Sequence, residues 1–413
     1  MSASAPRWSR RFPPVLILAL LVLFGLSDPA RCARGTGTGS ASAGSTDATA
    51  FRSEIPASPD SARDAAITRF ARDLAADVRA DDVGGITAAV FQGERMIWAR
   101  GFGWADRNRK IPAAVGTVYR TGSISKSVTA LVLARLADRG VVSLDDPVER
   151  YLPEIRALKD RPVGTDPITL RQLASHTAGL IREPELEGAA SGPIVLWEQR
   201  VLASIPTTRF QDLPGERYSY SNIGFGILGL TLSRAANRPF MDLVRELVFE
   251  PLEMTSSTFI LDAELESRLA TGYVNRRDGT IDAEHPAQEH EGRGYKVPNG
   301  GVYSTVHDMG RFMALMTGAL GHEILSPEVR EEMLTVQTPE EEDGGYGLGF
   351  SIATDSLAHR VMGHGGSVAG YNAYILFHPA TDLGVVLFRN YNRGETSLGG
   401  AARALLAELI RVS

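Results

Sequence analysis

Cysteine, lysine and long apolar runs are all scarce in this sequence of 413 residues. The single cysteine, Cys32, excludes a framework of internal disulfides, and its place in the N-terminal leader removes cysteine from the candidate nucleophiles. A net charge of -6 argues against nucleic-acid binding, which usually needs a basic surface. The eight histidines show no H-E-x-x-H or similar spacing, so we expect neither a metal site nor another cofactor.

Lysine is rare enough to be informative where it occurs. Arginine cannot give up its proton in a protein, whereas a buried lysine can. Lys126 follows Ser123 by three residues, so on a helix the two side chains would lie on the same face, one turn apart. This S-x-x-K spacing pairs a serine nucleophile with a base, although it also occurs by chance. Of the 43 basic residues only four are lysines: Lys110, Lys126, Lys159 and Lys296.

The residues after Ser123 continue with helical spacing and end at Gly140, which predicts a buried helix opened by the serine. Ser125 and Ser127 are rival hydroxyls. We place Ser125 lower than Ser123, because it is adjacent to Lys126 in the chain and would face another side of the helix.

The N-terminus has the features of an export signal. Three arginines precede an apolar run of about 12 residues, 15–26, which is too short for a comfortable membrane-spanning helix. We expect residues 1–32 to be a signal peptide or an N-terminal anchor, so the protein would be periplasmic or secreted, or tethered to the membrane. Residues 33–58, rich in Gly, Ser, Ala and Thr, form a flexible linker on this interpretation.

Strand patterns occur at both ends of the remaining chain, 59–413. Ile86–Phe91 and Arg95–Arg100 predict a hairpin, and the runs 359–363, 370–378 and 383–389 predict three further strands before a closing amphipathic helix, 401–412. Residues about 144–311 are mostly helical in pattern. The simplest assembly is an α+β fold: an antiparallel sheet built from both chain ends and flanked by helices, with an inserted, mostly helical domain. We see no internal repeats.

A second candidate motif is Tyr218-Ser-Tyr220-Ser-Asn222. In a short extended segment the side chains of Tyr220 and Asn222 would point to one side. A tyrosine near a lysine ammonium can lose or relay a proton, and an asparagine amide can donate to a substrate carbonyl. The alternative is an ordinary aromatic turn that leads into the helix 223–233.

A third candidate is the run from His364 through Gly365 and Gly366 to Ser367. Glycines at this density let a substrate approach the backbone closely. The N–H of Ser367 could join that of Ser123 in an oxyanion hole, a feature that often contributes more than any other to the acceleration of acyl transfer. The alternative is a glycine-rich hairpin turn with a solvent-exposed histidine.

Together, and in this order, S-x-x-K, Y-x-N and H-x-G resemble the serine β-lactamase and penicillin-binding-protein superfamily. The sequence is most similar to its class C-like branch, which includes esterases, D-aminopeptidases and D-Ala-D-Ala carboxypeptidases. Subsidiary features in the same order support the resemblance from about Pro59 to the C-terminus, among them 173–180, 299–305 and 346–350.

The resemblance implies that Ser123 is the acylated nucleophile, Lys126 its base or proton relay, and Tyr220 the second proton-transfer group. It implies that Asn222 positions the substrate amide. His364 stands where many β-lactamases have the lysine of K-T-G, whose fixed positive charge serves the substrate carboxylate. A histidine is mostly neutral at pH 7, so this departure disfavours efficient β-lactam hydrolysis.

We therefore expect an exported serine hydrolase that acts through an acyl-enzyme on a small-molecule or peptide substrate with an ester, amide or D-amino-acid peptide bond. One alternative is a true β-lactamase or D-Ala-D-Ala carboxypeptidase, for which Arg389 or Arg393 could bind the carboxylate. Another is a non-catalytic family member that binds cell-wall peptides or partners. The sequence does not predict an oligomeric state.

Three other patterns have simpler interpretations. The run 224–229 matches G-x-G-x-x-G but lacks the preceding strand of a dinucleotide site, so we expect these glycines to allow close helix packing. We expect His176 to be a structural hydrogen-bonding residue. The G-x-S-x-G elbow of α/β-hydrolases is absent around Ser123, which argues against a Ser-His-Asp triad.

Overall fold

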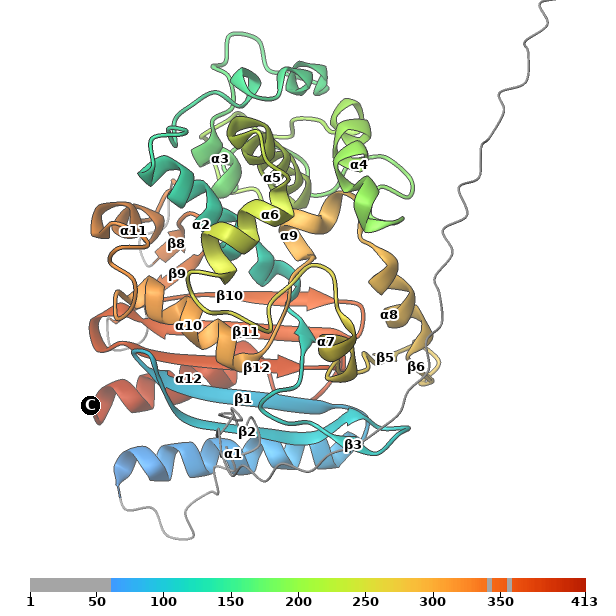
Figure 1. Ribbon diagram of the computed structural model, residues 1–413, viewed down its shortest axis with the longest axis vertical. Coiled ribbons are helices and arrows are strands. Elements are labelled where there is room, and N and C mark those ends of the chain that lie inside the picture. Colours follow the sequence, from blue (N-terminus) through green and yellow to red (C-terminus); the bar gives the residue numbers. More distant parts are fainter. Residues whose placement is uncertain (1–60, 340–343, 355–358) are drawn as a thin grey trace, which may run out of the picture. The chain divides into compact units, whose positions relative to one another are not determined.

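The computed structural model describes residues 61–339, 344–354 and 359–413 (Figure 1). The predicted signal peptide or anchor, the linker and the start of the folded part near Pro59 lie outside these residues. The division of the folded part into a main domain and a helical insertion at about 144–311 stays a prediction.

An eight-stranded antiparallel sheet is formed by strands from both ends of the chain, in the order β3-β2-β1-β12-β11-β10-β9-β8 (Figure 1). The predicted α+β fold with a sheet built from both chain ends is confirmed. The strands of this sheet are β1 Gly85–Gln92, β2 Arg95–Asp106, β3 Ile111–Pro112, β8 Gly344–Tyr346, β9 Ser351–Thr354, β10 Arg360–Val368, β11 Tyr371–His378 and β12 Leu383–Arg389.

Two short ribbons lie outside the large sheet. They pair β4 with β7 and β5 with β6. Their bounds are β4 Tyr119–Arg120, β5 Val274–Asn275, β6 Ile281–Asp282 and β7 Tyr303–Ser304. Strand β4 ends three residues before Ser123, so its pairing with β7 anchors the chain that leads into the predicted nucleophile.

The helices of the described residues are α1 Ala62–Asp81, α2 Ser125–Asp138, α3 Leu170–Ala174, α4 Trp197–Ser204, α5 Asn222–Ala236, α6 Phe240–Val244, α7 Ala263–Ser267, α8 Glu284–Gln288, α9 Val297–Gly300, α10 Val306–Thr317, α11 Pro327–Met333 and α12 Leu398–Arg411.

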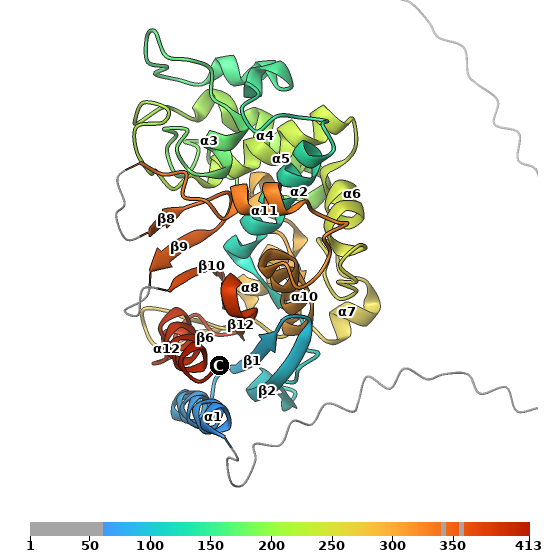
Figure 2. The same ribbon diagram turned by 90° about the vertical axis from the view of Figure 1, so that its left-hand side faces the viewer.

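Helices cover both faces of the sheet. Successive side chains of a strand point to opposite faces, and β1 is buried on both. Its residues Ile86, Ala88 and Val90 pack in one hydrophobic cluster with α1 and α12. Ala89 and Phe91 belong instead to the larger cluster that includes α10 and α2. Figure 2 shows α1 and α12 on one side of the sheet and α10 on the other. This double coverage explains why the central strands are apolar along their whole length.

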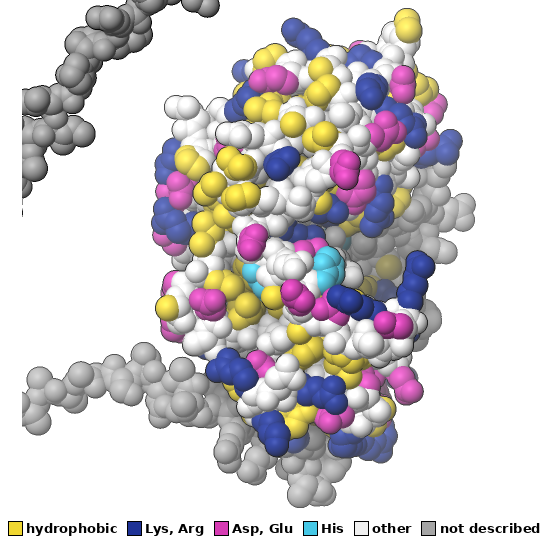
Figure 3. Space-filling view, turned by 90° about the vertical axis from the view of Figure 1, so that its right-hand side faces the viewer, with side chains coloured by type: hydrophobic (Ala, Val, Ile, Leu, Met, Phe, Trp, Pro, Cys, Tyr) yellow, Lys and Arg dark blue, Asp and Glu magenta, His cyan; other side chains and the backbone are white. Residues whose placement is uncertain are grey.

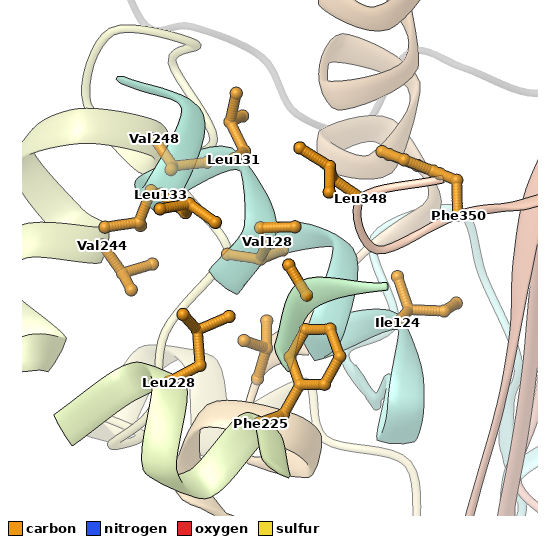
Figure 4. Packing of buried hydrophobic residues seen from close by; sticks show 14 of the residues in the cluster. Ile124, Val128, Leu131, Leu133, Phe225, Leu228, Val244, Val248, Leu348 and Phe350 are labelled. Carbon is orange, nitrogen blue, oxygen red and sulfur yellow. The ribbon is translucent and has the colours of Figure 1, made fainter. Parts of the chain in front are cut away.

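The helix predicted after Ser123 is α2, and it is buried on all sides up to Leu136. Figure 4 shows side chains of α2, such as Val128 and Leu131, packed against Phe225 and Leu228 of α5 and against the loop residue Leu348. A helix surrounded in this way cannot shift without opening the core. It therefore holds its first turn, and with it the site, in a fixed position.

Candidate active site

Ser123 lies in a single 3-10 turn, Gly122–Ile124, that leads directly into α2. The turn begins with Gly122 at φ 55°, a left-handed conformation that favours glycine. The next residue after the serine, Ile124, is fully buried and fixes the turn to the core. The local sequence therefore presents the Ser123 hydroxyl at the surface of a rigid element.

Lys126 is fully buried, and its Nζ lies 3.1 Å from Ser123 Oγ. The same Nζ donates to the carbonyl oxygen of Asn299 over 3.3 Å. Burial, helped by the nearby charge of Arg182, holds the pKa of Lys126 well below its ordinary value of 10.5. A neutral amine has a lone pair, and the Asn299 contact uses an N–H, so the lone pair is free to accept the Ser123 proton.

Tyr220 completes a cluster around Ser123. Lys126 Nζ lies 4.7 Å from the centre of the Tyr220 ring. Burial raises the pKa of Tyr220, although a side-chain hydrogen bond with Ser123 and the charge of Arg182 lower it in part. Both shifts have the same principal cause, because removal from water disfavours the charged form of each group and so favours the neutral amine and the protonated phenol.

His364 is buried and neutral. Its Nδ1 lies 2.6 Å from the Gly365 carbonyl oxygen, which can only accept, so Nδ1 carries the hydrogen. Nε2 then accepts from the Tyr346 hydroxyl over 2.8 Å. Burial and the neighbouring Lys126 lower the pKa of His364 to about 3. The sequence predicted a mostly neutral histidine at pH 7. The structure extends this neutrality far into the acid range.

The glycine-rich run lies within β10 and is not a hairpin turn. β9 pairs with β10 only as far as Gly363, so from His364 onward this edge of β10 has no strand partner among the residues that the structure describes. The edge packs against the Ser123 turn instead. A Cβ on Gly366 would come within 1.9 Å of the Thr121 carbonyl oxygen and 3.2 Å of the Ser123 nitrogen.

The same contact is seen from the turn side, where a Cβ on Gly122 would come within 2.7 Å of the Ser367 nitrogen. The backbone nitrogens of Ser123 and Ser367 therefore lie on two segments in direct contact. This is the placement that a two-donor oxyanion hole needs.

Asn222 is the first residue of α5 and follows Tyr220 by two residues in the chain. Its Nδ2 donates to Glu183 Oε1 over 2.6 Å, and its carbonyl oxygen accepts from Asn299 Nδ2 over 2.9 Å. Asn222 does not line the cleft described below. In this arrangement its amide is held by Glu183, so its predicted contact with a substrate amide stays a prediction.

Glu183 is a site residue that the sequence reasoning missed. It accepts from the Tyr295 hydroxyl and lies 3.1 Å from Lys296 Nζ. Burial raises the pKa of Glu183, but the hydrogen bonds from Tyr295 and Asn222 and the charge of Lys296 outweigh that effect. The net pKa is below its ordinary value, so the carboxylate is ionised. A signal was present: Lys296 is one of the four lysines, and the scarcity that singled out Lys126 also applies to it.

A cleft of about 470 Å³ opens beside Ser123. One wall carries Tyr220 and Arg182, and another is the free edge of β10. Asn372–Tyr374 of β11 and Thr396–Leu398 at the start of α12 extend it, together with Arg389. Thus Ser123, Tyr220, Gly365, Gly366 and Ser367 line one cavity, while Lys126 and His364 lie buried next to it.

The two arginines considered for carboxylate binding are placed differently. Arg389 lines the cleft, but it forms a buried ion pair with Asp77. Arg393 is exposed and is not among the residues that line the cleft. Neither arrangement leaves a free positive charge beside Ser123 from this part of the chain.

The rival interpretations are resolved by contacts. Ser125 Oγ accepts from the Val302 N–H, and Ser127 Oγ donates to the Gly349 carbonyl oxygen, so both hydroxyls hold α2 in place. His176 is buried and its Nδ1 accepts from the Ser221 N–H, in agreement with a structural role.

The G-x-G-x-x-G match lies inside α5, where a Cβ on Gly229 would meet the Pro298 ring at 2.4 Å, so close packing accounts for it. Among the residues that the structure describes, no three His, Cys, Asp or Glu side chains are placed to hold a metal ion. Within the same residues, no helix is both long and apolar enough to span a membrane.

Comparison with known proteins gives a family match over most of the chain. A family model described as Beta-lactamase matches residues 70–409. The D-alanyl-D-alanine-carboxypeptidase/endopeptidase AmpH of Escherichia coli is 31% identical over 232 residues, which are 55% of this chain and 56% of that protein. The chain thus matches little more than half of the length of AmpH.

Solved structures agree with the fold. The octameric penicillin-binding protein homologue from Pyrococcus abyssi has a TM-score of 0.70 and 26% identity, with 84% of this chain and 77% of that chain covered. A class C β-lactamase has a TM-score of 0.68 and 18% identity, with 84% of this chain and 96% of that chain covered. At 18% identity the second likeness shows the fold alone.

Proposed function

The chain belongs to the β-lactamase family, and we propose that it is an exported serine hydrolase that acts through a covalent acyl-enzyme on Ser123. The observation that carries this proposal is the buried Lys126 amine, which lies 3.1 Å from Ser123 Oγ and whose pKa is held well below 10.5. A lowered pKa lets an amine serve as a general base, whereas an exposed lysine is held in its charged form at neutral pH.

We propose the following first half of the reaction. Ser123 Oγ attacks the substrate carbonyl carbon as its proton moves to Lys126 Nζ. The N–H groups of Ser123 and Ser367 stabilise the oxyanion. The bond to the leaving group breaks, and the leaving group takes a proton from the Tyr220 hydroxyl, which Lys126 re-protonates. In the second half water replaces the leaving group and the same transfers run in reverse.

The substrate that we propose has an ester, amide or D-amino-acid peptide bond. The neutral His364 supplies no fixed charge for the carboxylate of a β-lactam, which disfavours efficient β-lactam hydrolysis. The likeness to AmpH, whose name gives a D-alanyl-D-alanine carboxypeptidase and endopeptidase, favours D-amino-acid peptides within this class.

Export belongs to the same proposal and rests on residues 1–32. Their basic start and short apolar run are typical of a secretory signal, which would be cleaved or kept as a tether. Cell fractionation of the full chain with a C-terminal tag, together with N-terminal sequencing of the product, tests it. A full-length protein in the cytoplasmic fraction would contradict export.

A comparison of initial rates on a chromogenic short-chain ester and a chromogenic cephalosporin tests the hydrolase, with Ser123→Ala as control. We expect ester turnover that is lost in the variant, with little cephalosporin turnover. Strong Ser123-dependent cephalosporin turnover would make the protein a β-lactamase. If neither substrate is turned over and neutral fluorophosphonate probes fail to label Ser123, the protein is a non-catalytic binder.

A further inference from the structure

Most of the lysine and arginine side chains around the cleft either form an ion pair with a carboxylate or are buried with a lowered pKa. Lys126 is buried, and burial holds its pKa well below the ordinary value and so disfavours its positive charge. Lys296 forms an ion pair with Glu183, and Arg389 forms one with Asp77. The side chains that could bind an anionic substrate are thereby reduced to those cations that have no carboxylate partner.

Arg182 is such a cation. Its side chain is exposed and lines the same cleft as Ser123, with its guanidinium carbon 4.8 Å from the centre of the Tyr220 ring. Among the described residues no carboxylate lies within ion-pair distance of it, because the adjacent Glu183 turns to Asn222 and Lys296.

The position of Arg182 is held in two ways. Its backbone carbonyl oxygen accepts from the Asn222 N–H over 2.8 Å, which fixes the main chain to the start of α5. A guanidinium over an aromatic face is stabilised by the ring quadrupole. Its N–H groups lie in the plane of the guanidinium and stay available for hydrogen bonds to a substrate. The charge is also felt at the reacting groups, since it lowers the pKa of both Lys126 and Tyr220.

We propose that Arg182 is the anion-recognising residue of this cleft and that the preferred acyl donor carries a carboxylate. The proposal rests on the hydrolase function proposed above and names its substrate class. A guanidinium binds a carboxylate through two parallel hydrogen bonds. The Arg182 guanidinium lies over the ring of Tyr220, which lines the same cleft as Ser123.

Three thioesters with one skeleton test the inference. Benzoylglycyl thioglycolate methyl ester is neutral. The free acid places a carboxylate on the leaving group, and a 4-carboxybenzoyl derivative of the methyl ester places it on the acyl group. Release of thiol by the full chain gives kcat/KM for each, and the ratio of anionic to neutral substrate removes any effect of a substitution on nucleophile activation.

We expect the wild-type protein to prefer at least one anionic thioester over the neutral one by about tenfold to a hundredfold, the usual range for a charge-assisted pair. In Arg182→Gln this ratio should fall to near one, and Arg182→Lys should keep part of it. Arg393→Gln, an exposed arginine outside the cleft lining, should leave the ratio unchanged. The substrate whose preference is lost identifies the side of the scissile bond that Arg182 serves.

An equal ratio in wild type and Arg182→Gln, or no anionic preference in the wild type, would overturn the inference while leaving the hydrolase intact. A measurement that does not depend on turnover separates the two proposals. In full-chain Ser123→Ala, calorimetry should show benzoylglycine binding more tightly than its methyl ester, and adding Arg182→Gln should remove the difference. If that difference is absent or survives the substitution, Arg182 is not the anion-binding group.

Discussion

At the scale of single residues, the burial of Lys126 accounts for the chemistry available to Ser123. Water removal disfavours the ammonium form, and the Asn299 carbonyl oxygen fixes one of the remaining N–H groups. An arginine at this position would stay charged and could not accept a proton. The use of lysine here, in a chain that otherwise prefers arginine, therefore has a direct chemical reason.

Replacing Lys126 by Met tests its role as the base. We expect the rate of Ser123 acylation to fall by about 10²–10⁴-fold, the usual contribution of a positioned general base. Phosphonylation of Ser123, followed by mass spectrometry over time, measures the rate. Lys159→Met, which changes an exposed lysine, is the control and should react like the wild type. Near-normal labelling in Lys126→Met would assign the proton transfer to another group.

Two adjacent residues should shift the pH profile in opposite directions. In the proposed mechanism Lys126 works as a neutral amine, so we expect kcat/KM to fall as the pH drops through its pKa. Arg182 lowers this pKa and Glu183 raises it. The acid limb of kcat/KM should therefore move to higher pH in Arg182→Gln and to lower pH in Glu183→Gln.

The control for this pair is Glu185→Gln, because Glu185 pairs with Arg209 and is exposed. Its acid limb should coincide with that of the wild type, measured on the neutral ester so that substrate charge plays no part. A common direction of shift in Arg182→Gln and Glu183→Gln would mean that a group other than Lys126 controls the limb.

The sequence predicted the contact of Ser123 with Lys126 because their spacing is local and one helical turn brings them together. Glu183 was out of reach, since its contact with Asn222 spans 39 residues and depends on the tertiary fold. The same holds for Arg389, which the sequence offered as a carboxylate binder. Its partner Asp77 is 312 residues away and could not be identified from spacing.

At the scale of elements, the site depends on a close approach between the strand β10 and the turn before α2. The sequence showed that Gly365 and Gly366 allow such an approach, but the alternative of a hairpin turn could not be resolved. The reason is that this part of β10 is paired on one edge only, so its sequence lacks the continuous apolar pattern of a strand inside a sheet. Only the tertiary contact shows that this edge faces Ser123.

Substitution of each glycine distinguishes contact from flexibility. A Cβ at position 366 would lie 1.9 Å from the Thr121 carbonyl oxygen, whereas one at 365 would approach the Tyr374 ring at 3.3 Å and no backbone atom closer than 4.0 Å. Gly366→Ala should push β10 away from the Ser123 turn, lower kcat/KM by about 10²–10³-fold and destabilise the fold by about 1–3 kcal/mol.

Gly365→Ala is the matched control in the same strand and should have a much smaller effect on both quantities. Ester turnover and urea unfolding measure them. If the two alanine variants behaved alike, the close approach of β10 would not be what positions the oxyanion donors.

At the scale of the whole molecule, strands from the two ends of the described chain pair in the middle of the sheet. β1 pairs with β12, and α1 lies with α12 on the same face (Figure 2). On the face shown in Figure 3, acidic and basic side chains are interspersed, as the small net charge leads one to expect. The sequence predicted a sheet built from both chain ends, because strand patterns occur at both. The order of the strands could be read only from their pairing in the structure.

A buried ion pair joins these two ends. Asp77 of α1 accepts from the Arg389 guanidinium of β12 and from the Glu395 N–H over 2.8 Å, and both charged side chains are almost fully buried. Removing one partner of such a pair leaves an uncompensated buried charge. Asp77→Ala should therefore lower the free energy of unfolding by about 3–5 kcal/mol.

Glu408→Ala is the matched control, because Glu408 also pairs with an arginine of α1, Arg69, but at the surface. Its cost should stay within about 1 kcal/mol, since water screens an exposed pair. Urea unfolding followed by circular dichroism compares the two. Activity at low temperature, per folded molecule and on the neutral ester, is measured in parallel, because Arg389 lines the cleft and loses its ion-pair partner in Asp77→Ala. Equal destabilisation by the two variants would show that the pair does not hold the chain ends together.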